Sequence, residues 1–528
     1  MFVPLTPLSF KQRAVRLYGS KLCSVDGDRR YTYADFDLRT RRLAARLRQD
    51  GLEPGERVAY LAYNSAELLE GYYGVLEAGG VLLPLNIRLA AHELAYILDD
   101  AGASFILVDP DFVQVYERIE QLLSRRPRVV WLGDTPPSRD EPAYEQWLGS
   151  TEPSGIDINA IDENSVAELF YTSGTTARPK GVMLTHRSLY LHALNVLTTF
   201  PADDHEVQLH TIPLFHVNGW GVPQLLTAVG GTHVMMRKFD PEAALQLIQS
   251  QRVSRFYVVP TMMTMLLNHP LLHQIDAGSM RFIKIGGGPA PAEMIRRAEA
   301  AFGCTVIAGY GLTETSPVLT LAVPKASLVG EDDDTRYRRQ ASTGLPLVGV
   351  ELEIVDDHGN ALPWDGSHEG EIVVRSNVVM KGYWNDPEAT EVAMRDGWFH
   401  TGDIATIDPE GYVLIVDRKK DIIISGGENI SSVEIEKTLY ECPAVLESAV
   451  IAVPDEQWGE VPLALVALRP GASITVDELD SFCRERLAPF KVPKTFEFVH
   501  ELPKGGTGKI LKARLREEHW RAMAKRVN

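Results

Sequence analysis

The chain has 528 residues, a length at which proteins divide into two or more domains rather than enlarge a single core. Apolar residues make up 45% of it and charged residues 23%, which is typical of a globular protein and excludes a disordered or fibrous one. The formal net charge of −18 argues against nucleic-acid partners, which need a basic surface, and requires that any anionic ligand be held by local donors.

The four cysteines, at positions 23, 304, 442 and 483, are far apart and include no CxxC pair. We therefore expect buried or unreactive thiols rather than disulfides or metal ligands. The first residues, MFVPLTPLSFKQR, do not form a signal peptide, and no apolar run approaches the roughly 18 residues of a spanning helix. The last residues, RVN, are not a peroxisomal address. These features predict a cytoplasmic protein that does not cross a membrane.

Helical and strand-like patterns alternate over the first part of the chain. Amphipathic helices are predicted over Tyr33–Asp50 and Glu67–Leu76, and short buried strands over Arg57–Ala62 and Ala103–Val108. Such alternation favours a parallel sheet covered by helices.

The same alternation returns further along the chain. Strands are predicted over Arg255–Val259, Arg281–Ile285 and Thr305–Ala308, and each ends in proline, glycine or polar residues. That ending matters because open α/β sheets bind ligands beyond the carboxyl ends of their strands. The charged stretch Glu331–Arg339 is interpreted as a solvated loop.

The sequence pattern changes after Asp417. A charged connection over 417–421 lies between two short β-like runs. Two longer β-like runs follow, and Thr475 and Glu478 have the spacing of a capping box at the start of an amphipathic helix. The predicted fold class is therefore α/β, with a large multi-layer domain over residues 1–417 and a small α+β domain over 418–528.

The segment that carries most chemistry is Tyr171-Thr-Ser-Gly-Thr-Thr-Ala-Arg-Pro-Lys-Gly181, between a predicted strand and a predicted helix. Its hydroxyls and backbone N–H groups can cradle phosphate oxygens, and Lys180 adds a positive charge. It is not a Walker loop, because Lys180 precedes Gly181 instead of following the second glycine of G-x-x-x-x-G-K-[ST].

Four further segments offer nucleotide-binding chemistry. The run Gly309-Tyr-Gly-Leu-Thr-Glu-Thr315 combines a flat aromatic face with oxygen donors of the kind that Mg²⁺ prefers. Glycines follow a predicted strand in Gly286-Gly-Gly-Pro-Ala-Pro291. The other two segments are Gly397-Trp-Phe-His-Thr-Gly-Asp403, which ends in a carboxylate, and Lys504-Gly-Gly-Thr-Gly-Lys-Ile510, which presents a lysine in a glycine loop.

Together, and in this order over nearly the whole chain, these segments resemble the adenylate-forming superfamily of acyl-CoA synthetases, peptide-synthetase adenylation domains and luciferases. The resemblance implies that Tyr310 stacks on adenine, Asp403 accepts the ribose hydroxyls and Lys509 contacts the α-phosphate and the carboxylate. It implies that ATP or AMP is bound by Thr172, Ser173, Gly174, Thr175, Thr176, Gly287, Gly288, Gly309, Tyr310, Gly311, Thr313, Asp403, Arg418 and Lys420. Mg²⁺ is assigned to Glu314 and Thr172, and catalysis to Lys509, Glu314, Thr313 and Lys180. Ala177 and Ala308 depart from the usual residues of the superfamily.

The same resemblance implies two reactions with different positions of a mobile small domain. Lys509 serves adenylate formation, and rotation at Lys420 then replaces it with a segment that lines the pantetheine tunnel of coenzyme A. The residues of this segment are Ser425, Gly426, Gly427 and Glu428. A side chain at Gly427 is expected to block the thiol.

The run Pro213-Leu-Phe-His-Val-Asn-Gly-Trp220 resembles the acyl-pocket segment of fatty acyl-CoA synthetases, with His216, Val217 and Trp220 at the acyl group. The expected partners are ATP, coenzyme A and a medium- or long-chain fatty acid, with a homodimer left open. Trp220 as an ordinary core residue, an aryl or other carboxylate–CoA ligase, and an adenylating enzyme with another acceptor all stay open. A non-catalytic binder is disfavoured by the joint presence of Lys180, Glu314, Asp403, Arg418 and Lys509.

Overall fold

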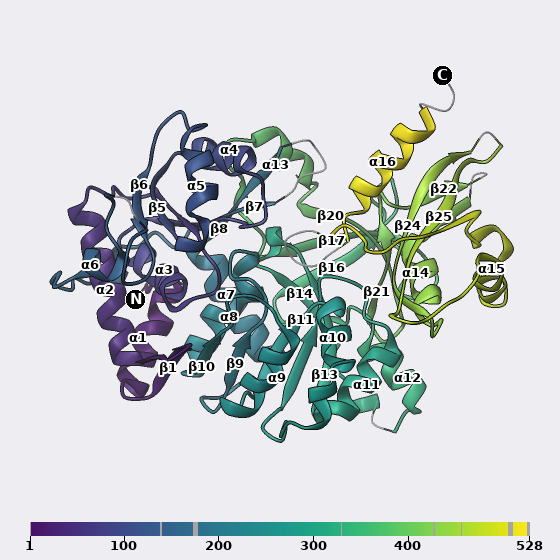
Figure 1. Ribbon diagram of the computed structural model, residues 1–528, viewed down its shortest axis with the longest axis horizontal. Helices are drawn as coiled ribbons and strands as arrows, with labels where there is room; N and C mark the ends of the chain where they lie inside the picture. The colour runs from purple at the N-terminus through teal and green to yellow at the C-terminus, as the bar shows by residue number, and fades with distance from the viewer. Residues whose placement is uncertain are drawn as a thin grey trace.

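The computed structural model describes residues 2–137, 140–172, 178–328, 330–425, 428–455, 457–504 and 510–524, without the side chains of 217, 218, 429, 518 and 521–524. The described chain forms four β-sheets with helices packed on them. The C-terminal sheet and its helices lie at one end of the molecule, on the right of Figure 1, and the N-terminal helices lie at the other end. The α/β fold class with a large and a small part is therefore confirmed.

The first large sheet has seven strands in the order β18-β8-β7-β4-β3-β5-β6. It is parallel from β7 to β6 and is covered on both faces, by α2 and α3 on one and by α4 and α5 on the other. Its strands are rich in leucine and valine because neither face meets water. The strands are β3 (Arg57–Leu61), β4 (Val81–Pro84), β5 (Ala103–Val108), β6 (Arg128–Trp131), β7 (Val166–Thr172), β8 (Lys180–Thr185) and β18 (Gly382–Tyr383).

The second large sheet has nine strands in the order β15-β14-β13-β12-β11-β9-β10-β1-β2. It is parallel from β13 to β1 and antiparallel at both ends. The strands are β1 (Leu22–Asp26), β2 (Arg29–Thr32), β9 (Val207–His210), β10 (Thr232–Met235), β11 (Arg255–Val258), β12 (Phe282–Ile285), β13 (Thr305–Gly311), β14 (Val318–Leu321) and β15 (Leu345–Pro346).

Helices of the large part cover these sheets or lie between them (Figure 1). They are α1 (Pro7–Tyr18), α2 (Tyr33–Gln49), α3 (Ala66–Glu77), α4 (Ala91–Ala101), α5 (Val113–Glu120), α6 (Tyr144–Leu148), α7 (His186–Thr199), α8 (Val217–Val229), α9 (Pro241–Ser250), α10 (Pro260–Leu267), α11 (Ala292–Phe302), α12 (Asp333–Gln340) and α13 (Pro387–Ala393).

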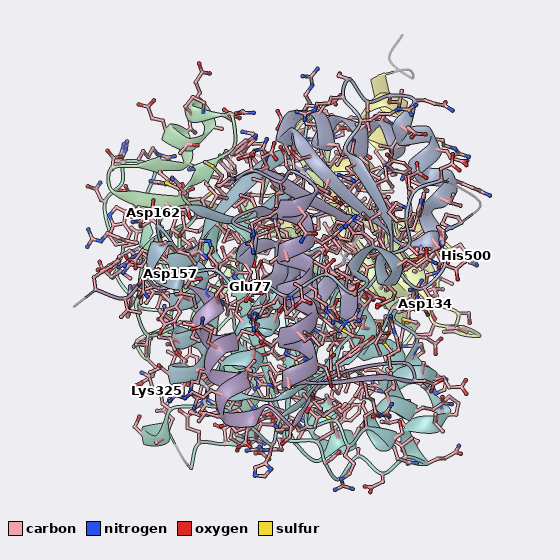
Figure 2. The ribbon with its side chains drawn as sticks, turned by 90° about the vertical axis from the view of Figure 1, so that its left-hand side faces the viewer. Glu77, Asp134, Asp157, Asp162, Lys325 and His500 are labelled. Atoms are coloured by element: carbon pink, nitrogen blue, oxygen red, sulfur yellow. The ribbon has the colours of Figure 1, made fainter. Side chains whose placement is uncertain are left out.

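Helix α3 lies in the middle of the large part and is buried at each of its 12 positions. The Tyr72 hydroxyl donates to Leu214 O, and the Tyr73 hydroxyl donates to Pro223 O at 2.9 Å, so the helix is fixed against the second sheet's layer. Glu77 at its end lies among the N-terminal helices (Figure 2) and pairs with the buried Lys11 at 2.5 Å. A helix that is covered on all sides must pair its charged residues internally.

A third sheet joins the large and small parts. It contains β16 (Val350–Val355), β17 (Gly370–Ser376), β19 (Met394–Arg395), β20 (Trp398–Ile407) and β21 (Val413–Arg418). The small part consists of β22 (Ile423–Ser425), β23 (Glu428–Ile430), β24 (Val445–Asp455), β25 (Gly459–Leu468), β26 (Thr495–Phe498), α14 (Ser432–Tyr440), α15 (Val476–Arg484) and α16 (Lys512–Ala524).

Most predicted elements are present, with ends shifted by one to a few residues. The strand predicted over Ala103–Val108 is β5, and the capping box of Thr475 and Glu478 opens α15. The four cysteines are free; Cys304 is half-buried and the other three are buried. Within the described ranges, no helix combines the length and apolarity needed to cross a membrane.

The prediction of a solvated loop over Glu331–Arg339 is wrong, because most of it forms helix α12. The Asp332 side chain accepts from Thr335 N at the helix start, and basic residues lie in the last turn, so the charges complement the helix dipole. Tyr337 is buried and lies under the Arg296 guanidinium of α11. The charge run is therefore the solvated face of a packed helix.

Candidate active site

Three of the expected nucleotide segments lie at the carboxyl ends of strands, namely β7, β12 and β13. Gly309 and Gly311 end β13, which pairs with β14 there. A Cβ atom at Gly311 would lie 1.8 Å from Pro317 O, and one at Gly309 would lie 3.0 Å from Leu321 Cδ2. Glycine is therefore required at 309 and 311, because neighbouring backbone and side chains approach closely there. The Tyr310 ring then lies between two residues without side chains.

Tyr310, Asp403 and Arg418 form one connected group, although they are far apart in the sequence. The Tyr310 hydroxyl donates to Asp403 Oδ2 at 2.6 Å, and Arg418 Nε lies 3.5 Å from Asp403 Oδ1. Asp403 and Arg418 are directly paired across β20 and β21. Burial, followed by the negative charge of Asp403, raises the pKa of Tyr310 well above its usual 10. The sheet thus holds a buried carboxylate beside an aromatic ring.

Glu314 lies in a short 3₁₀ helix, Thr313–Thr315, that follows β13. Its main-chain oxygen accepts from Met380 N at 2.7 Å, and its Oε1 accepts from the Tyr383 hydroxyl at 3.0 Å. Burial raises the pKa of its carboxyl above the usual value. Thr313 is buried beside it.

The donor set around Glu314 fits a Mg²⁺ ion that takes most of its ligands from phosphates and water. In the described part of the chain, no group of three or more His, Cys, Asp or Glu residues could hold a metal by itself. A single half-buried carboxylate with a neighbouring threonine is the kind of site that Mg²⁺ shares with a nucleotide. The ion would neutralise phosphate charge, and Glu314 would hold it.

Lys180 begins β8 directly opposite Thr172 at the end of β7. Its Nζ lies 3.5 Å from Asp386 Oδ2 and 5.2 Å from the centroid of the Tyr383 ring. The lysine therefore lies near the side chain that contacts Glu314. Ser173, Gly174, Thr175 and Thr176, predicted to bind phosphates, lie outside the described residues.

The expected acyl segment opens helix α8. His216 precedes its first residue, Trp220 is half-buried, and the side chain of Val217 lies outside the described residues. A Cβ atom at Gly287 would lie 3.6 Å from Trp220 Cζ2, and Gly287 has φ +74°. The loop after β12, which includes Gly288, therefore passes next to the Trp220 indole.

Residues of the expected hinge and tunnel lie where the third sheet meets the small part. Lys420 is exposed in the turn after β21, and its main-chain oxygen accepts from Arg516. Ser425 and Glu428 pair at the ends of β22 and β23. Gly426, Gly427 and Lys509 lie outside the described residues, so their predicted roles stay predictions.

Three residues near Glu314 and Trp220 were not predicted from the sequence. Tyr383 contacts Glu314 from 69 positions away, and no spacing in the sequence joins the two. Tyr257 and Lys284 are buried neighbours on β11 and β12, directly paired in register and next to Trp220. The lysine in the predicted strand Arg281–Ile285 could have indicated an unusual position, because a buried strand rarely carries a lysine.

Comparisons with known proteins agree with this geometry. Residues 11–384 match the AMP-binding enzyme family, and residues 434–509 match its C-terminal domain. The feruloyl-CoA synthase of an Amycolatopsis species is 40% identical over 92% of this chain and 93% of its own length. The 4-hydroxybutyrate–CoA ligase 2 of Metallosphaera sedula is 36% identical over 97% of this chain and 94% of its own. The medium-chain-fatty-acid–CoA ligase of Ectopseudomonas oleovorans is also 36% identical, over 97% and 95%.

Among solved structures, the anthranilate CoA ligase AuaEII in complex with anthranoyl-AMP superposes with a TM-score of 0.90 and 26% identity, and covers 99% of both chains. The family match spans well over half of the chain, and Tyr310, Asp403 and Arg418, which the resemblance assigns to nucleotide binding, are in contact with one another. The chain therefore belongs to the AMP-binding enzymes of the adenylate-forming superfamily.

Proposed function

We propose that the protein is an AMP-forming carboxylic acid–CoA ligase. The observation that carries this proposal is the Tyr310–Asp403–Arg418 group beside Glu314, which together offer an aromatic face, a ribose-binding carboxylate, a cation and a magnesium ligand. The three relatives named above are CoA ligases or synthetases, which supports coenzyme A as the acceptor.

The proposed reaction has two steps. A carboxylate oxygen of the acid attacks the α-phosphorus of ATP, a bond forms between them, and pyrophosphate leaves. The thiol of coenzyme A then attacks the acyl carbonyl, loses its proton to solvent, and AMP leaves. The first step brings two anions together, so it depends on local positive groups, in a chain whose net charge is −18.

Lys509 is proposed to supply positive charge in the first step, on a small domain that begins at Arg418 and rotates at Lys420. We expect Lys509→Ala to lower pyrophosphate release from acid and ATP about 100- to 1,000-fold. Thioester formation from supplied acyl-adenylate should change by less than about tenfold, because Lys509 has then moved away.

Lys504→Ala is the matched control, since this lysine begins the same glycine segment but pairs with Glu447 at 2.7 Å. It should leave both half-reactions unchanged. Equal losses of the two half-reactions in Lys509→Ala would refute the assignment.

The acid itself is the open part of the proposal. The similarity to the medium-chain ligase and the Trp220 segment favour a medium- or long-chain fatty acid. The other two relatives are named for 4-hydroxybutyrate and feruloyl substrates, which favours a short or aromatic acid with further oxygen atoms. Pyrophosphate release with a panel of these acids, with and without coenzyme A, separates the alternatives. Cytoplasmic location and a homodimer stay predictions.

A further inference from the structure

A cavity of about 350 Å³ lies among the N-terminal helices, where α1 and α2 meet the end of α3 and the chain segment 155–156. Sites for small molecules usually measure about 300–1,000 Å³, so this cavity suits a small metabolite rather than a nucleotide. The lining residues that matter below are Val15, Arg16, Asp37, Arg41, Glu77 and Ile156.

The cavity is separate from the candidate active site. Helix α3 connects the carboxyl end of β3 with the amino end of β4, and these two strands are parallel. Glu77, the last residue of α3, therefore lies near the amino ends of the strands (Figure 2). Thr172 lies at the opposite edge, at the carboxyl end of β7, which is parallel to β4.

Glu77 contributes an unpaired acceptor to the wall of the cavity. It is 5% exposed; its Oε1 pairs with Lys11 Nζ at 2.5 Å, and its Oε2 has no hydrogen-bond partner among the described residues. The fully buried Lys11 has no donor to spare, because its ammonium group also contacts Asp37 Oδ1 at 2.8 Å and Thr40 Oγ1 at 2.7 Å. The Thr40 hydroxyl donates to Asp37 O at 3.1 Å. Buried carboxylate oxygens are normally satisfied, so Oε2 indicates a donor from outside the chain, either water or a ligand.

The charges in the wall are separated. At the buried end, the carboxylates of Asp37 and Glu77 share the single ammonium group of Lys11, so one negative charge remains there. Nearer the entrance, Arg16 is exposed. Arg41 has a buried Nε without a partner in the described part of the chain, and its Nη1 lies 3.5 Å from Asp37 Oδ2. The wall therefore offers an acceptor at the buried end and donors near the entrance.

Arg48 fixes the walls of the cavity relative to one another. Its Nη1 donates to Glu77 O at 2.6 Å, and its Nη2 donates to Ser154 O at 3.4 Å, next to the segment 155–156. Ser154 N in turn donates to Arg41 O at 3.4 Å. The end of α3, helix α2 and the segment are thus held in one arrangement, which lowers the cost of ordering when a ligand binds.

We propose that this cavity binds a free amino acid with a small aliphatic side chain. The ammonium group of the ligand donates to Glu77 Oε2 and balances the remaining negative charge, and its carboxylate accepts from the guanidinium groups of Arg41 and Arg16. The half-buried Val15 and Ile156 pack against its side chain. An anion alone leaves Glu77 unpaired and a cation alone leaves Arg41 unpaired, so a zwitterion fits better than either. This site does not depend on the proposed ligase reaction.

The test measures binding to the full chain without ATP, by titration calorimetry and by the change in Tm. Valine is the first probe, since it carries both charged groups and a branched aliphatic side chain. It should raise the Tm as its concentration increases, because a ligand of the folded state stabilises that state by mass action. Isovalerate, which lacks the amine, and isobutylamine, which lacks the carboxylate, should each bind about 10- to 100-fold more weakly.

Arg41→Met should weaken valine binding about 10- to 100-fold. This variant keeps the buried contacts of Lys11, so a loss of folding does not explain the result. Glu77→Gln should weaken binding by a similar factor, because an amide supplies no negative charge to the ammonium group. Arg118→Met, at an exposed position of α5, is the control and should bind valine as the wild type does.

An unchanged Tm with valine, alanine and leucine would mean that the cavity holds only water, and would overturn the inference. Equal valine affinity in Arg41→Met and the wild type would also overturn it. Equal affinity for α-hydroxyisovalerate, in which a hydroxyl replaces the amine, would contradict the role of the ammonium group. Pyrophosphate release is not part of these measurements, so each outcome leaves the proposed ligase function intact.

Discussion

At the scale of single residues, Asp403 shows how the fold keeps a carboxylate in a buried position. The residue is 5% exposed, yet Arg418 balances its charge and it accepts a hydrogen bond from Tyr310. Buried carboxylates are retained when such partners satisfy them. The pairing of Asp403 with Arg418 across β20 and β21 fixes the position of its carboxylate beside Tyr310.

We expect Asp403→Asn to raise the KM for ATP about 10- to 100-fold, because hydrogen bonds from the ribose hydroxyls to a charged acceptor become bonds to a neutral one. Initial rates of pyrophosphate release at varied ATP measure the change. Asp365→Asn, at an exposed turn, is the control and should leave the KM unchanged. An unaltered KM in Asp403→Asn would exclude this carboxylate from the nucleotide site.

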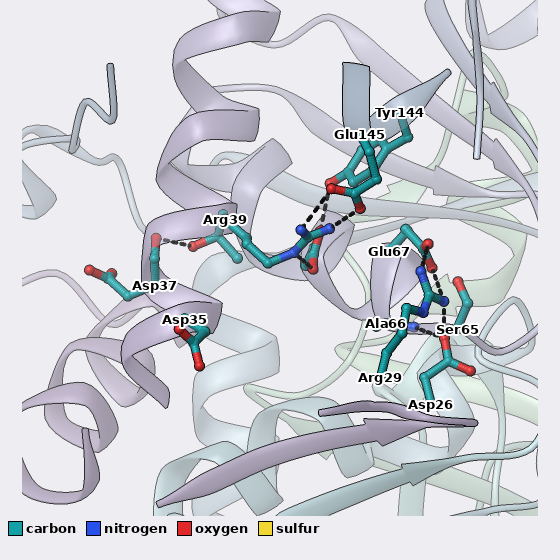
Figure 3. Close-up of polar contacts among 12 residues, drawn as sticks. Asp26, Arg29, Asp35, Asp37, Arg39, Ser65, Ala66, Glu67, Tyr144 and Glu145 are labelled. Carbon is teal, nitrogen blue, oxygen red and sulfur yellow. Dashed lines mark hydrogen bonds and ion pairs between the residues drawn. The ribbon is translucent and has the colours of Figure 1, made fainter. Parts of the chain in front are cut away.

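At the scale of elements, helix α3 depends on cations supplied by its neighbours. Arg29 pairs with Glu67, and Arg39 of α2 binds Glu70 through Nε at 2.5 Å and Glu145 through Nη1 at 2.9 Å (Figure 3). The Tyr144 hydroxyl adds a hydrogen bond to Glu70 at 2.7 Å. The network supplies hydrogen bonds and positive charge to the α3 carboxylates, which are buried between the two large sheets.

Arg39→Met should lower the free energy of unfolding by about 3–5 kcal/mol, because it leaves the buried Glu70 without its cation. Burial raises the pKa of Glu70 to about 7, and removal of Arg39 raises it further. A carboxyl whose folded-state pKa is raised loses stability as pH rises, so the deficit should be larger at pH 8 than at pH 5.5. Urea denaturation at both pH values measures it.

Arg41→Met is the control on the same helix, since Arg41 forms only a partly exposed pair with Asp37 at 3.5 Å. Its loss should stay below about 1 kcal/mol at both pH values. A deficit in Arg39→Met that does not depend on pH would contradict the role of Glu70.

At the scale of the whole molecule, buried histidines link folding to pH. His192 Nε2 accepts from Val318 N at 3.1 Å, so this nitrogen carries no proton. His210 Nε2 and His233 Nδ1 are 2.9 Å apart, so one of them must also be an acceptor. Burial lowers the pKa of His192 to about 3 and that of His210 to about 3, and it lowers the pKa of His233 well below 6.5.

The unfolded chain binds protons at these histidines below about pH 6.5, whereas the folded chain does not. The free energy of unfolding should therefore fall as pH drops from about 6.5 towards 4, by about 1.4 kcal/mol per pH unit for each buried histidine. His192→Gln should remove one such contribution from the slope, measured by denaturation between pH 7.5 and 5. The exposed His358→Gln should leave the slope unchanged, and an equal effect of the two variants would contradict the argument.

Local sequence was sufficient where the structure depends on local patterns. Strand β5 and the capping box of Thr475 and Glu478 were predicted correctly because side-chain alternation and cap spacing act over a few residues. Helix α12 was missed because its charged composition hides two buried residues, Tyr337 and Gln340, that contact α11. The Tyr383–Glu314 contact was missed for a related reason, since it joins residues 69 positions apart.

The sequence by itself determined the adenylate-forming family and the α/β class. The motifs of glycine, hydroxyl and lysine residues, and the alternation of helices and strands, each depend on residues that are consecutive in the chain. Only the tertiary structure decided that Asp403 meets Tyr310 across 93 positions and that Tyr383 meets Glu314 across 69. Those contacts depend on which strands become neighbours in a sheet, and that order follows from packing of the whole chain rather than from any local periodicity.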